Sequence, residues 1–155
     1  MASRHKTQQR TEPQTKHQSK QPSKQQAAEG LEPAASGNVV ILHGVLSSPP
    51  RSRELPSGSV LWSWEVTTRD LQGAAQTVPV VAFDPPKLAH KLEAGDHVVV
   101  AGQVRRRFFR AGGATVSRTE VVASGIANVR RTASVRRIVA SAEASVAALA
   151  ANLAS

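Results

Sequence analysis

The chain has 155 residues and a formal net charge of +9 at pH 7, from 20 lysines and arginines against 11 acidic residues. This length suits one globular domain with flanking segments, and the basic excess favours an anionic partner, either nucleic acid or an acidic membrane surface. The absence of cysteine excludes a disulfide framework, a thiolate nucleophile and a cysteine-based zinc site.

Residues 1–37 are dominated by Gln, Lys, Ser, Thr and Pro, and Leu31 is their only large apolar residue after the first methionine. Such a segment cannot bury enough surface to offset the entropy of ordering, so we predict a disordered basic tail. Its excess of basic residues fits either a weak hold on phosphates or a solubilising role. The segment lacks the apolar core of a secretion signal, and no run in the chain could span a bilayer. We therefore expect a cytoplasmic protein without membrane contact.

A globular domain is predicted for residues 38–128, beginning with an apolar strand over residues 39–46. Two prolines end that strand, and residues 51–58 then predict a charged loop closed by a Pro-Ser-Gly turn. Residues 60–68 and 77–83 predict the second and third strands, because β-branched and aromatic residues are frequent in both.

Side-chain alternation assigns the faces of these strands. Val60, Trp62, Trp64 and Val66 share one face of the second strand, and we predict that the two tryptophans point into the core with the valines. In the third strand Pro79 lacks a backbone N–H, which predicts a sheet edge or a bulge there.

A short helix is predicted over about residues 86–92, with Asp84 as its N-cap and Gly95 after its C-terminus. Its apolar side would close one end of a barrel and consists of Leu88, Ala89 and Leu92. The histidines of this domain show no metal-binding spacing, so no metal or other cofactor is predicted.

A long β-hairpin follows, with the sequence VVVAGQVRRRFF over residues 98–109, a flexible turn over residues 110–113 and a returning strand over residues 114–123. Alternation places valines on a core face, and on the opposite face it places Gln103, Arg105, Arg107 and Phe109. The arginines could instead merely protect an exposed sheet edge, although that role does not account for the neighbouring phenylalanines.

This order of strands, one short helix and a long hairpin predicts an all-β domain, a five-stranded OB-fold barrel with the helix between strands three and four. Residues 129–155 form an Arg- and Ala-rich extension that predicts a helix from about Thr132. An apolar stripe with alternating spacings of four and three residues follows this helix, and it could pack on the barrel or on another copy. The stripe consists of Val135, Val139, Ala142, Val146, Leu149 and Leu153.

Several segments together resemble the bacterial single-stranded DNA-binding protein family over residues 38–128. They are NVVILHGVL, the Pro-Ser-Gly turn before Val60, PVVAF, KLAHKLEAGDHVVVAGQVRRRFF and SRTEVVA. The resemblance implies an OB-fold that binds single-stranded DNA with little sequence preference. It also implies a homotetramer that acts at the nucleoid in DNA replication, repair or recombination.

The resemblance places Phe109 at a stacking position of that family and Phe83 near another. Thr77 stands where many members have a stacking tryptophan, so the aromatic platform is reduced. The acidic C-terminal tail by which typical members recruit partners is absent from this sequence, which argues against that recruiting role.

An electropositive groove with exposed aromatic rings is what binding of single-stranded nucleic acid requires. We therefore predict that Phe109 and Phe83 stack on bases. The arginines expected to contact the backbone are Arg105, Arg107 and Arg110 of the hairpin together with Arg51, Arg53 and Arg69 of the loops.

RNA is an alternative ligand, because OB barrels bind either nucleic acid. A protein assembly module is an alternative of a different class. We do not expect an enzyme, because the acidic residues are scattered and the sequence has no Gly-rich phosphate loop.

Overall fold

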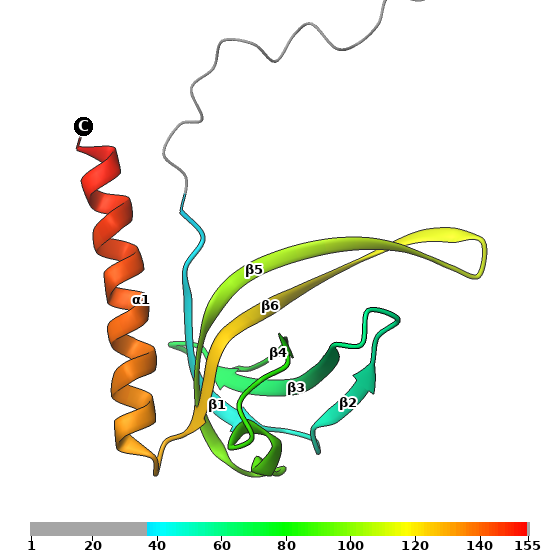
Figure 1. Cartoon of the computed structure of the whole chain (residues 1–155), viewed down its shortest axis with the longest axis horizontal. Coiled ribbons are helices and arrows are strands. Elements are labelled where there is room, and N and C mark those ends of the chain that lie inside the picture. The colour runs from blue at the N-terminus through cyan, green and yellow to red at the C-terminus, as the bar shows by residue number, and fades with distance from the viewer. Residues whose placement is uncertain (1–36, 155) are drawn as a thin grey trace, which may run out of the picture. The chain divides into compact units, whose positions relative to one another are not determined.

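The computed structural model describes residues 37–154, which form a mostly β domain with one α-helix (Figure 1). The predicted disordered tail lies outside the described residues, except for Gly37. The elements are strands β1 (Val40–Leu46), β2 (Arg51–Glu54), β3 (Val60–Arg69) and β4 (Ala75–Phe83), the 3-10 helix η1 (Ala89–Lys91), strands β5 (His97–Ala111) and β6 (Ala114–Asn128), and helix α1 (Thr132–Leu153).

The six strands form one sheet in the order β1-β5-β6-β4-β3-β2, and β1 also pairs with β3. All pairs are antiparallel except β4 with β6, which pair in parallel at Val80↔Val121 and Val81↔Val122. Because β1 pairs with both β5 and β3, its ladders connect the two sides of the sheet. Pro79 precedes the short β4–β6 ladder, so its missing N–H falls where β4 pairs only with β3, which agrees with the predicted edge.

Strand β2 corrects the prediction of a loop over residues 51–58. Residues Arg51–Glu54 pair antiparallel with β3, from Arg51↔Ser63 to Glu54↔Val60. The Pro-Ser-Gly turn is present after them, with Gly58 at a φ of 84°. All four residues of β2 are polar and exposed, so no apolar alternation marks the strand, and it exists because β3 offers a free edge.

The core side of the sheet agrees with the predicted alternation. Trp64 is only 1% exposed, and Val66, Val98 and Val100 are fully buried beside it. Trp62 is half-buried on the same face, and its indole lies 4.3 Å from the His90 ring, with an angle of 6° between the planes.

The predicted helix over residues 86–92 is wrong, because only Ala89–Lys91 form a single 3-10 turn. Asp84 is not a helix N-cap. It has a φ of 45°, and its Oδ1 accepts a 2.8 Å hydrogen bond from the Val60 N–H at the start of β3. Residues three apart align in a 3-10 turn, so Ala89 and Leu92 enter the core while Leu88 stays exposed.

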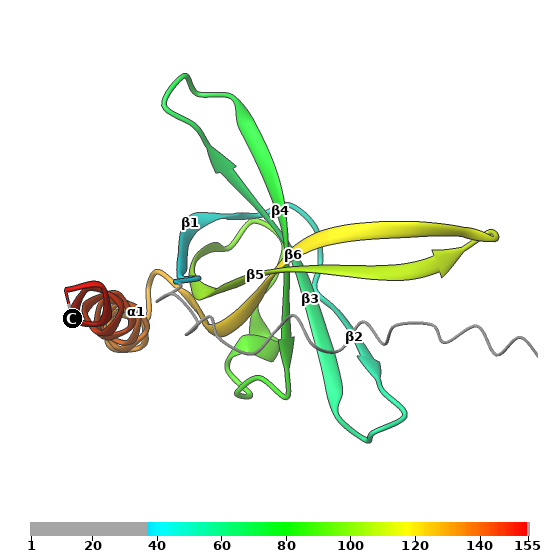
Figure 2. The same ribbon diagram turned by 90° about the horizontal axis from the view of Figure 1, so that it is seen from above.

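The β5–β6 hairpin extends well beyond the rest of the sheet, as Figure 2 shows. Its ladder runs from Val98↔Asn128 to Ala111↔Ala114, so the returning strand is longer than predicted. A bulge at Ser124 shifts the register between Ala101 and Gly102. A Cβ added to Gly102 would lie 2.2 Å from the Val122 carbonyl oxygen, so this close approach of the two backbones requires glycine.

Helix α1 begins at Thr132 as predicted and packs along β1, β5 and β6 at the base of the hairpin (Figure 1). Ala142 is buried there, and Ile138 lies against Gly125. Val146 and Leu153 of the predicted stripe remain exposed, so the chain's own sheet covers only part of it. Within residues 37–154, no helix has the length and hydrophobicity to cross a membrane.

Candidate nucleic-acid interface

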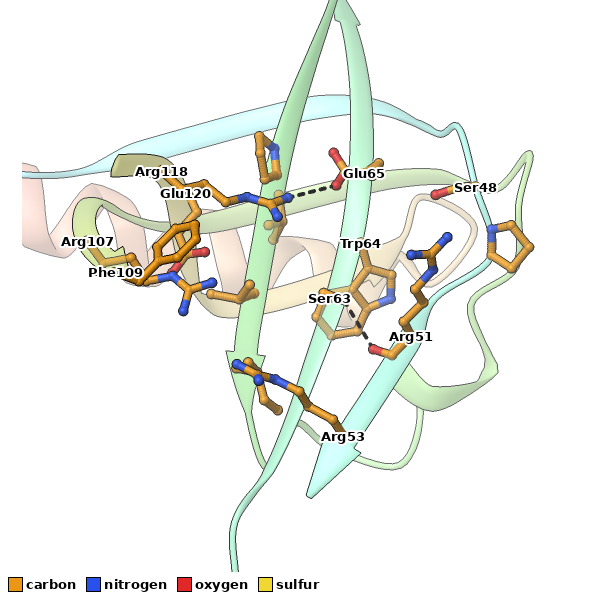
Figure 3. Close-up of a pocket in the computed structure, with 15 residues that line it drawn as sticks. Ser48, Arg51, Arg53, Ser63, Trp64, Glu65, Arg107, Phe109, Arg118 and Glu120 are labelled. Atoms are coloured by element: carbon orange, nitrogen blue, oxygen red, sulfur yellow. Dashed lines mark hydrogen bonds and ion pairs between the residues drawn. The ribbon is translucent and has the colours of Figure 1, made fainter. Parts of the chain in front are cut away.

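A groove of about 630 Å³ lies between the surface of β2, β3 and β4 and the face of the β5–β6 hairpin that carries Arg107 and Phe109 (Figure 3). We call this face the groove side of the hairpin. Its charged lining consists of four arginines and two glutamates: Arg51, Arg53, Arg107, Arg118, Glu65 and Glu120. Its apolar lining includes Phe109, Leu61, Pro79 and Val81, and Trp64 adjoins it from the core. The groove therefore combines cationic groups on both walls with one exposed aromatic ring.

Strand β2 fixes two of the predicted arginines. Arg51 and Arg53 are two residues apart, so their side chains leave the same face of the strand and both line the groove (Figure 3). Within residues 37–154, neither forms an ion pair. Their positive charge is therefore available to a ligand.

The opposite wall is organised by a buried carboxylate. Glu120 is 2% exposed, and its Oε1 accepts a 2.8 Å hydrogen bond from Arg105 Nη2. Arg107 Nε lies 3.3 Å from the same oxygen and forms an ion pair without a well-aligned hydrogen bond. One carboxylate thus serves two guanidinium groups, so this cluster has a net charge of +1. Farther out, Arg118 Nη2 lies 3.1 Å from Glu65 Oε1.

The guanidinium groups of Arg105 and Arg107 each also lie over an aromatic ring. Arg105 Cζ is 5.5 Å from the Phe83 ring centroid, and Arg107 Cζ is 5.5 Å from the Phe109 ring centroid. Phe109 is 39% exposed and Phe83 is 43% exposed. The arrangement leaves part of each ring open for stacking and holds a positive charge beside it.

The structure therefore brings most of the predicted site residues together. Arg51, Arg53, Arg107 and Phe109 line the groove. Arg105 adjoins it through its ion pair with Glu120, and Phe83 lies beside Arg105.

Two predicted site residues lie elsewhere. Arg69 is at the tip of the β3–β4 hairpin, where its Nη1 donates a 2.9 Å hydrogen bond to the Gly73 carbonyl. Arg110 lies at the tip of the β5–β6 hairpin, on the face opposite Phe109.

Sequence reasoning missed Glu120 and Arg118, although a usable signal was present. Counting outward from the two-glycine turn places Glu120 directly opposite Arg105 and Arg118 opposite Arg107, as the ladder has them. Residues directly opposite in an antiparallel pair share a face, so the charge compensation followed from the turn position.

Among the described residues, no group of three or more His, Asp or Glu side chains is arranged to hold a metal ion. In comparisons with known proteins, no family model matches the chain, and no curated protein matches it.

Proposed function

We propose that this protein binds single-stranded DNA with little sequence preference, in the groove between β2 and the β5–β6 hairpin. The observation that carries the proposal is the placement of Arg107 and Phe109 opposite Arg51 and Arg53 across that groove. Cationic walls follow a phosphate backbone, and an exposed ring stacks on bases, at about 1–3 kcal/mol per base. Stacking requires unpaired bases, which favours single strands over duplex.

The proposed fold is an OB-type barrel of β1, β3, β4, β5 and β6, with β2 as an added edge strand. The cycle of ladders through β1, and the short η1 between β4 and β5, support this proposal. A barrel of this type commonly binds oligonucleotides on its exposed surface rather than in its core, and the groove lies on that surface. Self-association and a role in DNA replication, repair or recombination belong to the same proposal.

A fluorescence anisotropy titration with single-stranded DNA, single-stranded RNA and duplex DNA tests the proposal. We expect single-stranded DNA to bind more tightly than duplex. RNA binding as tight as DNA binding would widen the ligand class to single-stranded nucleic acid. Equal affinity for duplex and single strands would refute the proposal.

Two variants separate charge from stacking. Arg51→Ala combined with Arg53→Ala should flatten the slope of log affinity against log salt by up to about 1.4, since each phosphate contact on a single strand contributes about 0.7. The matched control, Arg130→Ala with Arg136→Ala, removes the same charge from exposed positions outside the groove and should change the slope less. Phe109→Ala should weaken binding of single-stranded DNA by about 1–3 kcal/mol at every salt concentration.

A further inference from the structure

The β5–β6 hairpin has a second face that the groove does not use. We call it the outer face, and its side chains alternate with those that line the groove. On β5 it presents Arg106, Phe108 and Arg110, and directly opposite them on β6 it presents Thr119, Ser117 and Thr115. Each of these three cross-strand pairs therefore joins an arginine or a phenylalanine to a hydroxyl group.

Phe108 is the most exposed of the three phenylalanines, at 66%. Arg106 Cζ lies 5.1 Å from its ring centroid, and Arg106 Nη2 donates a 2.9 Å hydrogen bond to Ser117 Oγ. This guanidinium and ring repeat the arrangement of Arg107 and Phe109 on the groove side. The outer face thus has its own stacking surface with a cation held beside it.

The two faces differ in charge compensation. On the groove side, Glu120 pairs with Arg105 and Arg107, and Glu65 pairs with Arg118. Residues 104–119 include no acidic residue, so no carboxylate of the hairpin offsets the two arginines of the outer face. An anion is therefore attracted to this face at least as strongly as to the groove side of the hairpin.

We infer that the outer face is a second contact for single-stranded nucleic acid, so that one hairpin holds two separate segments, one on each side. This inference rests on the proposed function. Guanidinium and hydroxyl groups donate hydrogen bonds to phosphate oxygens, and the Phe108 ring stacks on a base. An apolar protein partner suits the face less well, because arginines and hydroxyl groups flank its single ring, and the exposed Val104 lies beyond Arg106.

The consequence is a further activity, the bridging of two single strands. A base on Phe108 and a base on Phe109 lie on opposite sides of a two-stranded ribbon, so they belong to different segments. The two segments can come from one long strand or from two molecules. Short oligonucleotides separate these sources, because a short strand cannot pass around the hairpin to reach both faces.

Energy transfer between two short thymidine oligonucleotides, one with a donor dye and one with an acceptor, tests the inference on the full chain. The two strands cannot pair with each other, so transfer reports bridging by protein. We expect transfer with the parent protein and its loss in Phe108→Ala, which should bind a single labelled oligonucleotide almost as tightly as the parent. Phe109→Ala is the matched change on the other face, and it should weaken that single-strand binding by about 5- to 150-fold.

Three results would contradict these expectations in distinguishable ways. Unchanged transfer in Phe108→Ala would overturn the inference and assign bridging to separate copies of the protein. A lower light-scattering mass in Phe108→Ala would also overturn it, since the outer face would then be an interface between copies. Absence of binding to any single oligonucleotide by the parent would instead overturn the proposed function itself.

Discussion

Replacing Glu120 by glutamine should strengthen binding of single-stranded DNA, although the substitution removes a buried ion pair. The carboxylate is 2% exposed and holds Arg105 at 2.8 Å and Arg107 at 3.3 Å. Glutamine has the same shape and keeps an oxygen that can accept a hydrogen bond from Arg105. It removes the negative charge, so the net charge of this cluster rises from +1 to +2.

The size of the effect follows from counterion release. One additional unit of positive charge that meets a phosphate steepens the dependence of log affinity on log salt by up to about 0.7 on single strands. A tenfold reduction in salt should therefore favour Glu120→Gln over the parent by a further factor of up to about five. Stability should fall at the same time by about 1–3 kcal/mol, because the Arg105 and Arg107 guanidinium groups lose their anionic partner.

The assay is a series of anisotropy titrations across salt concentrations, together with thermal denaturation of each variant. Glu143→Gln is the matched control, since it removes one negative charge from an exposed position of α1 outside the groove. We expect the control to leave the salt slope nearly unchanged. Equal slopes for folded Glu120→Gln and the parent would show that Arg105 and Arg107 contact no phosphate. Weaker binding at every salt concentration would show that the carboxylate matters more for positioning the guanidinium groups than for opposing the ligand.

Three further predictions concern packing and assembly. Trp64→Ala should lower stability by about 3–5 kcal/mol in thermal or chemical denaturation, while the folded fraction still binds; lost binding at an unchanged melting temperature would contradict the assigned faces. Gly102→Ala should lower the free energy of unfolding by about 1–3 kcal/mol, because the added Cβ meets the backbone oxygen of Val122. Gly125→Ala should lower the free energy of unfolding by less, because its added Cβ meets the side chain of Ile138 rather than backbone. Val146→Ser with Leu153→Ser should lower the light-scattering mass if α1 joins copies, and an unchanged mass would leave α1 packed on its own domain alone.

The sequence predicted the parts of the fold in which burial imposes a period of two. Alternation assigned Trp64 and Val100 to the core and Phe109 to the opposite side, and the structure confirms each assignment. The long helix α1 was also evident, because strong helix formers and an apolar stripe agree over its whole length.

The missed features depend on pairing rather than on composition. Strand β2 is exposed on both sides, so only its ladder with β3 defines it. Asp84 and the prolines after it are as suitable for a turn as for a helix start, and the hydrogen bond to Val60 selects the turn. The bulge at Ser124 cannot be inferred from alternation, and it changes the register at the base of the hairpin but not at its tip.

The position of β1 in the sheet also affects the rate of folding and the tendency to aggregate during folding. The β1–β3, β3–β4 and β5–β6 ladders join segments that are near in sequence, whereas β1 pairs with β5, which lies far along the chain, from Val40↔Gly102 to Val45↔His97. A pairing this distant slows folding, because loop closure must precede the contacts that reward it. Until β1 docks, the β5 and β3 edges are open to other unfolded chains, so refolding at high protein concentration should favour aggregation over the native ladder.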